Sequence, residues 1–478
     1  MSTFFDVANV IDQFKKQMHN SFDVESRILV KENDKVGFLF LKSFTDNQLF
    51  IDGIFLPISK FDGKVDIDLL EHNIVKSGDV SEIKQEQVLE KVLNGNVVII
   101  TQNKQKFVAV DIQKYPARIP SEPPTSPVIQ GPREGFTEDI KTNITLIRRR
   151  LYTEDLVLKQ FSVGKLTGTK VIVAYLHGVA DKKVVKMVEE RLKKIDVDGI
   201  LDSYYILSFL EDRPNSLFKQ IGRSEKPDII VSKMLEGRVA IIVDGSPIVL
   251  SVPFLLIEDM QSSNDYYTNH HYSSLVRIVR MLGIIVAILA PGMYLSLQLY
   301  HYNILPLNFL VTVADTTQGL PFTPFLELLF ISLLFQILYE VSLRLPSYLG
   351  LATSVVGALI LGDTGVKAGL ISPPGVIVVA LAKIALYTAP EQSSQITVLQ
   401  MVFLLIGGCL GLFGVVTGFI YLVNYLNNLD SFGTPYLSPY CPRRQKDLQD
   451  AIIKEPVTQK VGRPDMINLS NKRGQNER

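Results

Sequence analysis

The sequence contains no tryptophan and only two cysteines among its 478 residues, and its 49 basic and 49 acidic residues cancel. Cys409 lies in an apolar stretch and Cys441 lies near the C-terminus, which excludes a disulfide framework and a cysteine-rich metal cluster. Because the net charge is zero, nothing favours a nucleic-acid-binding protein. Without tryptophan, tyrosine must provide any aromatic anchoring at a membrane surface.

Residue combinations that carry enzymatic chemistry are also missing. Paired carboxylates, Ser/His/Asp sets, Cys/His metal ligands and a phosphate-binding GxxxxGK[ST] loop do not occur with suitable spacing. His270 and His271 are adjacent, so they cannot both face one metal ion from a helix, and we expect them at a membrane surface. The sequence therefore predicts no catalytic residue, no cofactor and no metal, and it argues against an enzyme.

Charged residues are distributed unevenly along the chain. Residues 1–275 hold 35 basic and 38 acidic residues, residues 276–425 hold five of each, and residues 426–478 hold nine and six. Such a change separates a region that lies in water from one that lies in lipid. We therefore expect a soluble front half, a multi-pass helical membrane domain at 275–425, and a charged cytoplasmic tail at 426–478.

The front half alternates strand and helix patterns, which predicts an α/β fold. Its start, MSTFFDVANVIDQFKK, has neither the basic beginning nor the apolar core of a signal peptide, so we expect this half in the cytoplasm. β-branched runs around polar turns predict hairpins at 94–112 and 236–254. Two interpretations stay open: a divergent duplication with subdomains at 1–114 and 137–257, or two separate α/β domains that both end in a hairpin.

A proline-rich segment at 115–136 is expected to be an extended linker between these subdomains. The sequence that follows it, TEDIKTNITLIRRRL, predicts an amphipathic helix with Thr137 as its N-cap. Arg148, Arg149 and Arg150 lie at the C-terminal end of this helix. They are interpreted either as the solvated end of a well-capped helix or as part of a coupling helix that pairs with carboxylates on a neighbour.

The basic residues around the apolar segments predict how these segments are oriented. The segments are 281–299, 322–341, 349–361, 374–389 and 396–425. Under the positive-inside rule, four crossings and a re-entrant segment at 349–361 place the front half and the tail inside and loop 390–395 outside. Five crossings would place the basic tail outside, and six would need a segment that the sequence does not display.

Four glycines recur in the last apolar segment at spacings of four, three and four residues: Gly407, Gly411, Gly414 and Gly418. On one helix this spacing places them on a single face, where backbones can approach closely. We therefore expect this face to be a helix-packing surface.

Charged residues within the apolar segments are candidates for a membrane path or an ion pair. Lys383 lies inside segment 374–389, where an unpaired ammonium is costly. Glu327 and Glu340 are its expected partners, by elimination. The alternative is a tilted or re-entrant helix that lets the lysine head reach the membrane surface.

Several long strings resemble one protein family. GPREGFTEDIKTNITLIRRRL, VDGSPIVLSVPFLL, LAPGMYLSL, LRLP, SVVGALILGDTGVKAGLISP and VIVVALAKIAL, in order between residues 131 and 425, resemble the A subunit of the GerA-type spore germinant receptors. The resemblance implies a nutrient receptor subunit in the inner membrane of a dormant spore, with a transporter-like B subunit and a lipoprotein C subunit as partners. It also implies a homo-oligomer that contributes an ion-conducting or signalling path. Lys383 departs from the small or hydroxyl side chain that we expect of this family.

Two other kinds of protein remain as alternatives. A stand-alone secondary transporter would need more crossings and inverted repeats. A membrane-tethered scaffold would use its soluble modules only to bind a partner.

Overall fold

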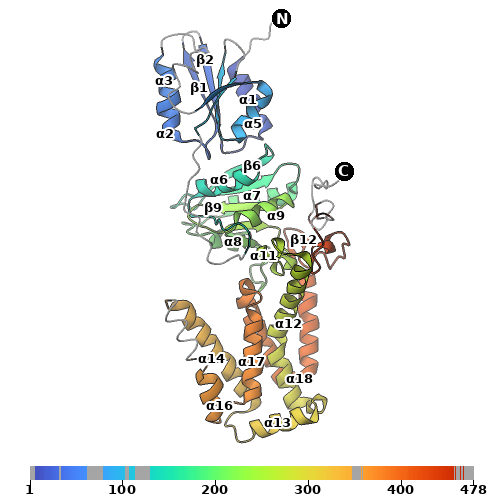
Figure 1. The fold of residues 1–478 in the computed structure, drawn as a ribbon. Helices are drawn as coiled ribbons and strands as arrows, with labels where there is room; N and C mark the ends of the chain where they lie inside the picture. The colour runs from blue at the N-terminus through green and yellow to red at the C-terminus, as the bar shows by residue number, and fades with distance from the viewer. Residues whose placement is uncertain are drawn as a thin grey trace. The chain divides into compact units, whose positions relative to one another are not determined.

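The computed structural model describes residues 6–31, 34–61, 79–102, 107–112, 130–346, 357, 359–456, 458, 463, 464 and 467. The chain forms two compact units, Met1–Phe254 with Asp430–Thr434 and Val461–Arg478, and Leu255–Leu429 with Pro435–Lys460. The first unit holds two five-stranded sheets, and the second is helical (Figure 1). The predicted fold class, an α/β front half followed by a helical region, is confirmed. Most of the predicted linker and of segment 349–361 lies outside the described residues.

The two sheets share one topology. In the first module, residues 6–112, the strand order is β1-β2-β4-β5-β3, and in the second module, residues 130–254, it is β6-β7-β9-β10-β8. All neighbouring strands are antiparallel in both sheets. Adding five to each strand number of the first sheet gives the second sheet, so the structure favours the duplication interpretation.

The helices occupy equivalent positions in the two modules as well. A helix precedes the first strand of each sheet (α1 and α6), and another precedes the fourth strand (α5 and α9). The first module consists of α1 Val7–Gln17, β1 Val24–Lys31, β2 Asp34–Leu41, α2 Asn47–Phe50, α3 Leu56–Lys60, β3 Val80–Ile83, α5 Val88–Leu93, β4 Val97–Thr101 and β5 Phe107–Val110. The second consists of α6 Ile140–Arg150, β6 Leu156–Val163, β7 Thr169–Leu176, α7 Lys182–Lys194, α8 Ser203–Leu210, β8 Gly222–Ser224, α9 Pro227–Leu235, β9 Val239–Val243 and β10 Val249–Val252.

The apolar strands β4 and β9 are buried along their whole length because helices cover both faces of each sheet. Side chains of a strand alternate between its faces. Val98 and Ile100 therefore pack with α1 and α5, whereas Val97 and Ile99 pack with α2 and α3. In the second module α6 and α9 cover one face of β9, and α7 and α8 cover the other.

Helix α6 begins later than its sequence suggests. Its N-cap is Asp139, whose carboxylate accepts hydrogen bonds from the backbone N–H groups of Lys141 and Thr142. Thr137, the predicted cap, instead exchanges hydrogen bonds with the side chain of Asn143, at 2.8 and 2.6 Å. The prediction was wrong because a buried asparagine one turn into the helix holds Thr137 in the preceding loop.

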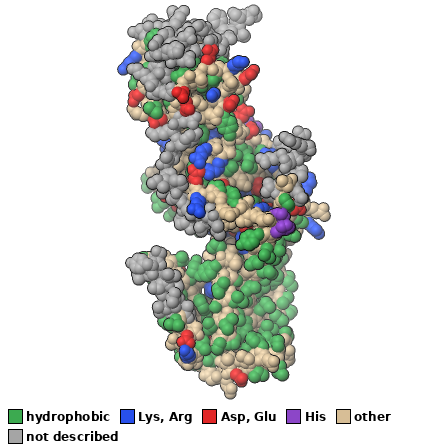
Figure 2. Space-filling view, in the orientation of Figure 1, with side chains coloured by type: hydrophobic (Ala, Val, Ile, Leu, Met, Phe, Trp, Pro, Cys, Tyr) green, Lys and Arg blue, Asp and Glu red, His purple; other side chains and the backbone are tan. Residues whose placement is uncertain are grey.

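Within the described part of the second unit, three helices are long and apolar enough to cross a membrane: His270–Tyr300, Pro324–Arg344 and Pro390–Asn427. Figure 2 shows that hydrophobic side chains cover most of the visible face of this unit. Its main helices are α12 His270–Tyr300, α13 Leu307–Thr317, α14 Pro324–Arg344, α16 Gly365–Lys367, α17 Pro373–Leu386 and α18 Ser393–Asn427, and α10 Leu256–Asp259 and α11 Ser263–Tyr266 precede them. The strands β11 Asp430–Ser431 and β12 Thr434–Pro435 form a short hairpin after α18.

Helix α18 is folded back on itself at Gly411. This residue has φ 61° and ψ −156°, a conformation that essentially only glycine adopts. In a straight helix Phe403 and Gly418 would be about 22 Å apart along the axis. A Cβ placed on Gly418 would instead lie 3.3 Å from the ring of Phe403. The last apolar segment, expected to be one helix, is therefore a pair of arms, 393–410 and 412–427.

The positions of the helix ends also differ from the expected topology. A Cβ on Gly283, at the start of the apolar part of α12, would lie 3.4 Å from the carbonyl oxygen of Ala385, close to the end of α17. Gly411 lies beside Tyr300, at the other end of α12. Loop 390–395 therefore lies at the same end of the helical unit as the start of α12, and not at the opposite end as the distribution of basic residues predicted.

The C-terminal tail returns to the start of α12. Arg277, with a fully buried side chain, donates hydrogen bonds to the carboxylates of Asp265 and Asp450 at 3.2 and 3.0 Å and to the carbonyl of Ala451 at 2.8 Å. Lys454 also reaches the backbone carbonyl of Asp265. These bonds tie the two flanks of the helical unit together at one end.

Candidate functional site

The two modules of the first unit meet along the loop that follows α1. The backbone N–H of Phe22 donates to the carbonyl of Leu158 at 2.9 Å, and the N–H of Leu158 donates to the Ser21 hydroxyl at 3.0 Å. This pair of bonds extends the edge strand β6 with the loop of the first module. The loop is thereby held in one register on the second module.

Arg148 fills the centre of this junction. Its guanidinium binds both carboxylate oxygens of Asp23, through Nε at 2.8 Å and Nη2 at 2.9 Å. The two side chains are only 1% and 2% exposed. Further hydrogen bonds run from the guanidinium to the carbonyls of Thr153 and Leu156, at 3.2 and 3.1 Å, and to the Ser21 hydroxyl at 3.2 Å. A planar guanidinium suits such a bidentate, desolvated pair, and lysine would not replace it.

The other two arginines of α6 have a different environment. Arg149 and Arg150 both donate to the carboxylate of Glu134, at 3.0 and 2.7 Å, and Glu134 belongs to the same module. Arg149 is 48% exposed, so the solvated-end interpretation describes it well. It does not describe Arg148, which is buried against the other module.

Two further bonds connect α6 and its flank to the first module. The Thr145 hydroxyl donates to the carbonyl of Ser43 at 2.9 Å, and the Tyr152 hydroxyl donates to the carbonyl of Glu90 at 2.6 Å. Helix α6 therefore contacts the neighbouring module on one side while it covers its own sheet on the other.

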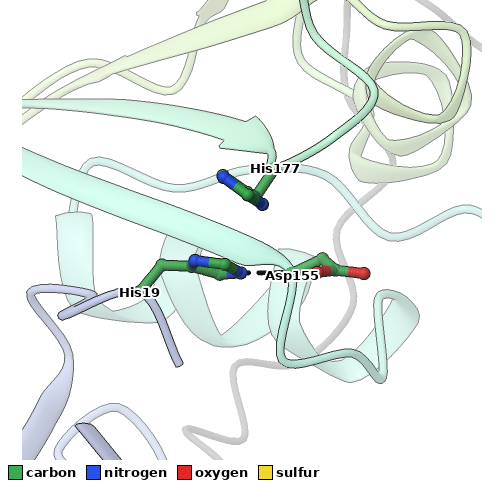
Figure 3. Close-up of side chains that lie close together, drawn as sticks. All are labelled: His19, Asp155 and His177. Atoms are coloured by element: carbon green, nitrogen blue, oxygen red, sulfur yellow. Dashed lines mark hydrogen bonds and ion pairs between the residues drawn. The ribbon is translucent and has the colours of Figure 1, made fainter. Parts of the chain in front are cut away.

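A cluster of two histidines and an aspartate lies at the edge of the same junction (Figure 3). His19 follows α1 in the first module, Asp155 precedes β6, and His177 follows β7. The imidazole rings stack with centroids 3.8 Å apart, and His19 Nε2 lies 3.4 Å from Asp155 Oδ1. Partial burial of the ring, followed by the effect of the His19 ring, lowers the pKa of His177 and favours its uncharged form.

The helical unit contains a buried carboxylate on α14, Glu327, which contacts the start of α17. Glu327 is 2% exposed, and its Oε1 accepts hydrogen bonds from the backbone N–H and the hydroxyl of Ser372, both at 2.6 Å. Ser372 is also the N-cap of α17 and accepts from the N–H of Gly375. The carboxylate therefore lies at the positive end of the α17 dipole, where a negative charge is favoured.

Among the residues that the structure describes, neither predicted carboxylate lies beside Lys383. The Lys383 ammonium, on a side chain that is largely buried, donates to Gln336 Oε1 at 3.2 Å. Glu340 pairs with Arg344 one turn further along α14, at 2.7 Å. Glu327 precedes Gln336 by nine residues, or about 13 Å along α14, which puts it out of reach.

The four glycines pack closely, but they do not share one helix face, because α18 folds back at Gly411. A Cβ on Gly407 would lie 3.0 Å from Cα of Gly292 in α12, so the two helix backbones are in direct contact there. Gly414 and Gly418 face residues of the first arm of α18. The prediction of one continuous face was wrong, since the spacing rule assumes an unbroken helix.

Sequence reasoning missed several residues of these sites. They are Ser21 and Asp23 in the junction, His19, Asp155 and His177 at its edge, and Gln336 and Ser372 in the helical unit. Asp23 is 125 positions away from Arg148, so no local pattern connects the two. The run of three arginines at the end of α6 was the available signal, because one of them could be expected to have a buried carboxylate partner. The sequence contains many carboxylates, however, and does not indicate which one is the partner.

The comparison with known proteins covers nearly the whole chain. Residues 12–466 match the Bacillus/Clostridium GerA spore germination protein family. The chain is 32% identical over 475 residues to spore germination protein KA of Bacillus subtilis (strain 168), covering 98% of this chain and 87% of that protein. It is 31% identical over 473 residues to spore germination protein A1 of the same organism, covering 96% and 97%.

A membrane protein and a solved structure are also similar. The chain is 35% identical over 406 residues to the uncharacterized membrane protein YfkQ of Bacillus subtilis (strain 168), covering 84% of this chain and 79% of that protein. It is 30% identical to the crystallised N-terminal domain of the A subunit of the Bacillus megaterium spore germinant receptor GerK3, which covers 52% of this chain and 95% of that domain at a TM-score of 0.41. The family match spans far more than half of the chain. This protein therefore belongs to the GerA family of spore germination proteins.

Proposed function

We propose that this chain is the A subunit of a nutrient receptor complex in the spore inner membrane and that it contributes an ion-conducting or signalling path. The observation that carries the proposal is the family match from residue 12 to residue 466, which includes both the soluble modules and the apolar helices. In this proposal a transporter-like B subunit and a lipoprotein C subunit are its partners, and copies of the A subunit assemble with one another.

The buried polar groups of the helical unit support the ion-path part of the proposal. Glu327 and Lys383 are buried among apolar helices, where ionisable side chains are costly and most often serve a function. Their hydrogen-bond partners, Ser372 and Gln336, are uncharged. Among the described residues, no ion pair neutralises either side chain, as an ion-path role would require.

Deleting the gene in its spore-forming host tests the proposal. We expect deletion spores to lose the fall in optical density that follows at least one nutrient, and a reintroduced copy to restore it. Co-isolation of B and C subunits with the tagged chain is the companion result. Normal germination of deletion spores with every nutrient that triggers the parent strain would contradict the proposal.

We propose a topology in which the start of α12, loop 390–395 and the tail share the cytoplasmic side, while Gly411 lies outside. The tail bonds of Arg277 and the contact of Gly283 with the end of α17 support this arrangement. The soluble modules would then also be cytoplasmic.

Single cysteines test this topology in a background carrying Cys409→Ser and Cys441→Ser. We expect an impermeant maleimide to label Gln318→Cys in intact cells. After permeabilisation it should also label Glu391→Cys, an exposed position of the loop, and native Cys441 in protein with only Cys409 replaced. The four-crossing alternative predicts external labelling of Glu391→Cys, so that one position separates the two topologies. External labelling of Cys441 would contradict both.

Lys383→Met is expected to change the rate of ion release during germination by roughly tenfold, because it removes a charge in a poorly solvated environment. Lys383→Arg should retain most of the wild-type rate. Lys367→Met is the matched control, since Lys367 is exposed and pairs with Asp363 one turn away. Lys383→Glu should be rescued in part by Gln336→Lys. An unchanged rate in Lys383→Met spores that contain normal amounts of the chain would remove Lys383 from the path.

A further inference from the structure

Three potential metal ligands from two modules converge at the edge of the junction in the first unit. One ligand atom from each of His19, Asp155 and His177 lies within 4.8 Å of the other two (Figure 3). They form the one such group among the residues that the structure describes. The first ligand comes from the first module and the other two come from the second.

Backbone hydrogen bonds and dihedral angles position these three side chains. The N–H of His177 donates to the carbonyl of Asp155 at 2.8 Å, which fixes the two ligands of the second module side by side. His19 and Asn20 both adopt left-handed conformations, with φ 53° and 51°, which are uncommon for residues other than glycine. These angles direct the His19 ring toward Asp155 while Ser21 and Phe22 bind β6.

The contact between His19 and Asp155 is too long to stabilise the junction strongly by itself. The 3.4 Å separation between His19 Nε2 and Asp155 Oδ1 is longer than a good hydrogen bond. The two imidazole rings stack with their centroids 3.8 Å apart, so both ring edges lie beside the Asp155 carboxylate.

Two imidazoles and one carboxylate form a ligand set that suits divalent zinc, iron, cobalt and nickel. A shared ion bound at about 2.0–2.2 Å needs its ligand atoms roughly 3.4 Å apart. His19 is half-exposed, and Asp155 and His177 are exposed. Rotation of these three side chains would therefore bring their ligand atoms to that separation. Three protein ligands would leave at least one position for water, as the exposure of Asp155 allows.

We propose that His19, Asp155 and His177 form a binding site for a divalent transition-metal ion such as Zn²⁺, which links the two soluble modules. The ion would add a further connection to those that Arg148, Thr145 and Tyr152 already make with the first module. The inference does not depend on the proposed function, because its test measures bound metal.

The test uses the full-length protein, purified in detergent with a tag that lacks histidine. After equilibrium dialysis against micromolar Zn²⁺, the bound metal is measured by mass spectrometry. We expect one zinc ion per chain for the wild type and a loss of at least tenfold in affinity for His19→Gln, Asp155→Asn and His177→Gln. With Co²⁺ in place of Zn²⁺, the wild type should show visible ligand-field absorption that the three variants lack.

The matched control is the double variant His270→Gln/His271→Gln. These rings also lie 3.9 Å apart, but within the described part of the chain no third ligand joins them. We expect this control to bind zinc as the wild type does. The proposal is overturned if the wild type retains no more zinc than the three cluster variants and gives no cobalt absorption, or if the control variant loses the ion. Gel filtration and circular dichroism confirm that each variant is folded.

Discussion

Replacing Arg148 with methionine is expected to lower the free energy of unfolding of the first unit by about 3–5 kcal/mol. The substitution leaves the Asp23 carboxylate buried without its bidentate partner, and it removes bonds to Ser21, Thr153 and Leu156. The urea concentration at which a protease cleaves the first unit of the full-length protein reports the loss. In spores, the same variant should reduce the nutrient response if α6 couples the two modules.

Two variants separate the buried pair from general effects of charge. Arg149→Met is the matched control, and its cost should be about 0–1 kcal/mol because Arg149 is half-exposed. The double variant Arg148→Met/Asp23→Leu replaces both charges by apolar groups and should recover much of the lost stability. Equal stability of Arg148→Met and Arg149→Met would contradict the structural account. A stable Arg148→Met variant with a normal nutrient response would reject the coupling role of α6.

Gly407→Leu is expected to prevent assembly of the helical unit. Its side chain would enter the contact between α12 and α18, where a Cβ would already lie 3.0 Å from Cα of Gly292. Neither backbone can move without opening the bundle, so the cost should exceed the 1–3 kcal/mol that is typical of overpacking. We expect a large loss of the chain from the membrane fraction and of monodisperse protein in detergent.

Gly362→Leu is the matched control for this substitution, because a Cβ at Gly362 would meet no atom of the described residues within 4 Å. Gly292→Leu should reproduce the effect of Gly407→Leu from the other helix, since its Cβ would lie 2.8 Å from the carbonyl carbon of Phe403. Normal recovery of both the Gly407→Leu and Gly292→Leu proteins would show that the two helices do not pack in this way.

The sequence predicted the parts of the fold that depend on local patterns. Alternating β-branched residues indicated the hairpins of β4–β5 and β9–β10, and apolar spacing indicated α7. The composition change near residue 275 falls within α12, which begins at His270. These features can be predicted from the sequence because each depends on residues that are close together in the chain.

Contacts between distant residues could not be predicted in the same way. The partner of Arg148, Asp23, lies in another module. The partner of Lys383, Gln336, depends on how far α14 and α17 are shifted along their axes relative to each other, and the sequence spacing within one helix does not reveal this shift. The fold of α18 depends on the dihedral angles of Gly411, a residue that looks identical to Gly407 in the sequence. A glycine can allow close packing or a reversal of the chain, and only the tertiary structure decides between them.

The release of potassium from spores after addition of a nutrient tests the proposed role most directly. The measurement compares the parent strain, a deletion strain and the deletion strain with a restored copy, using an ion-selective electrode. We predict prompt release from the parent and the restored strain and no release from the deletion strain with at least one nutrient. Release from the deletion strain at the parental rate with every effective nutrient would contradict a role for this chain in nutrient-triggered ion release.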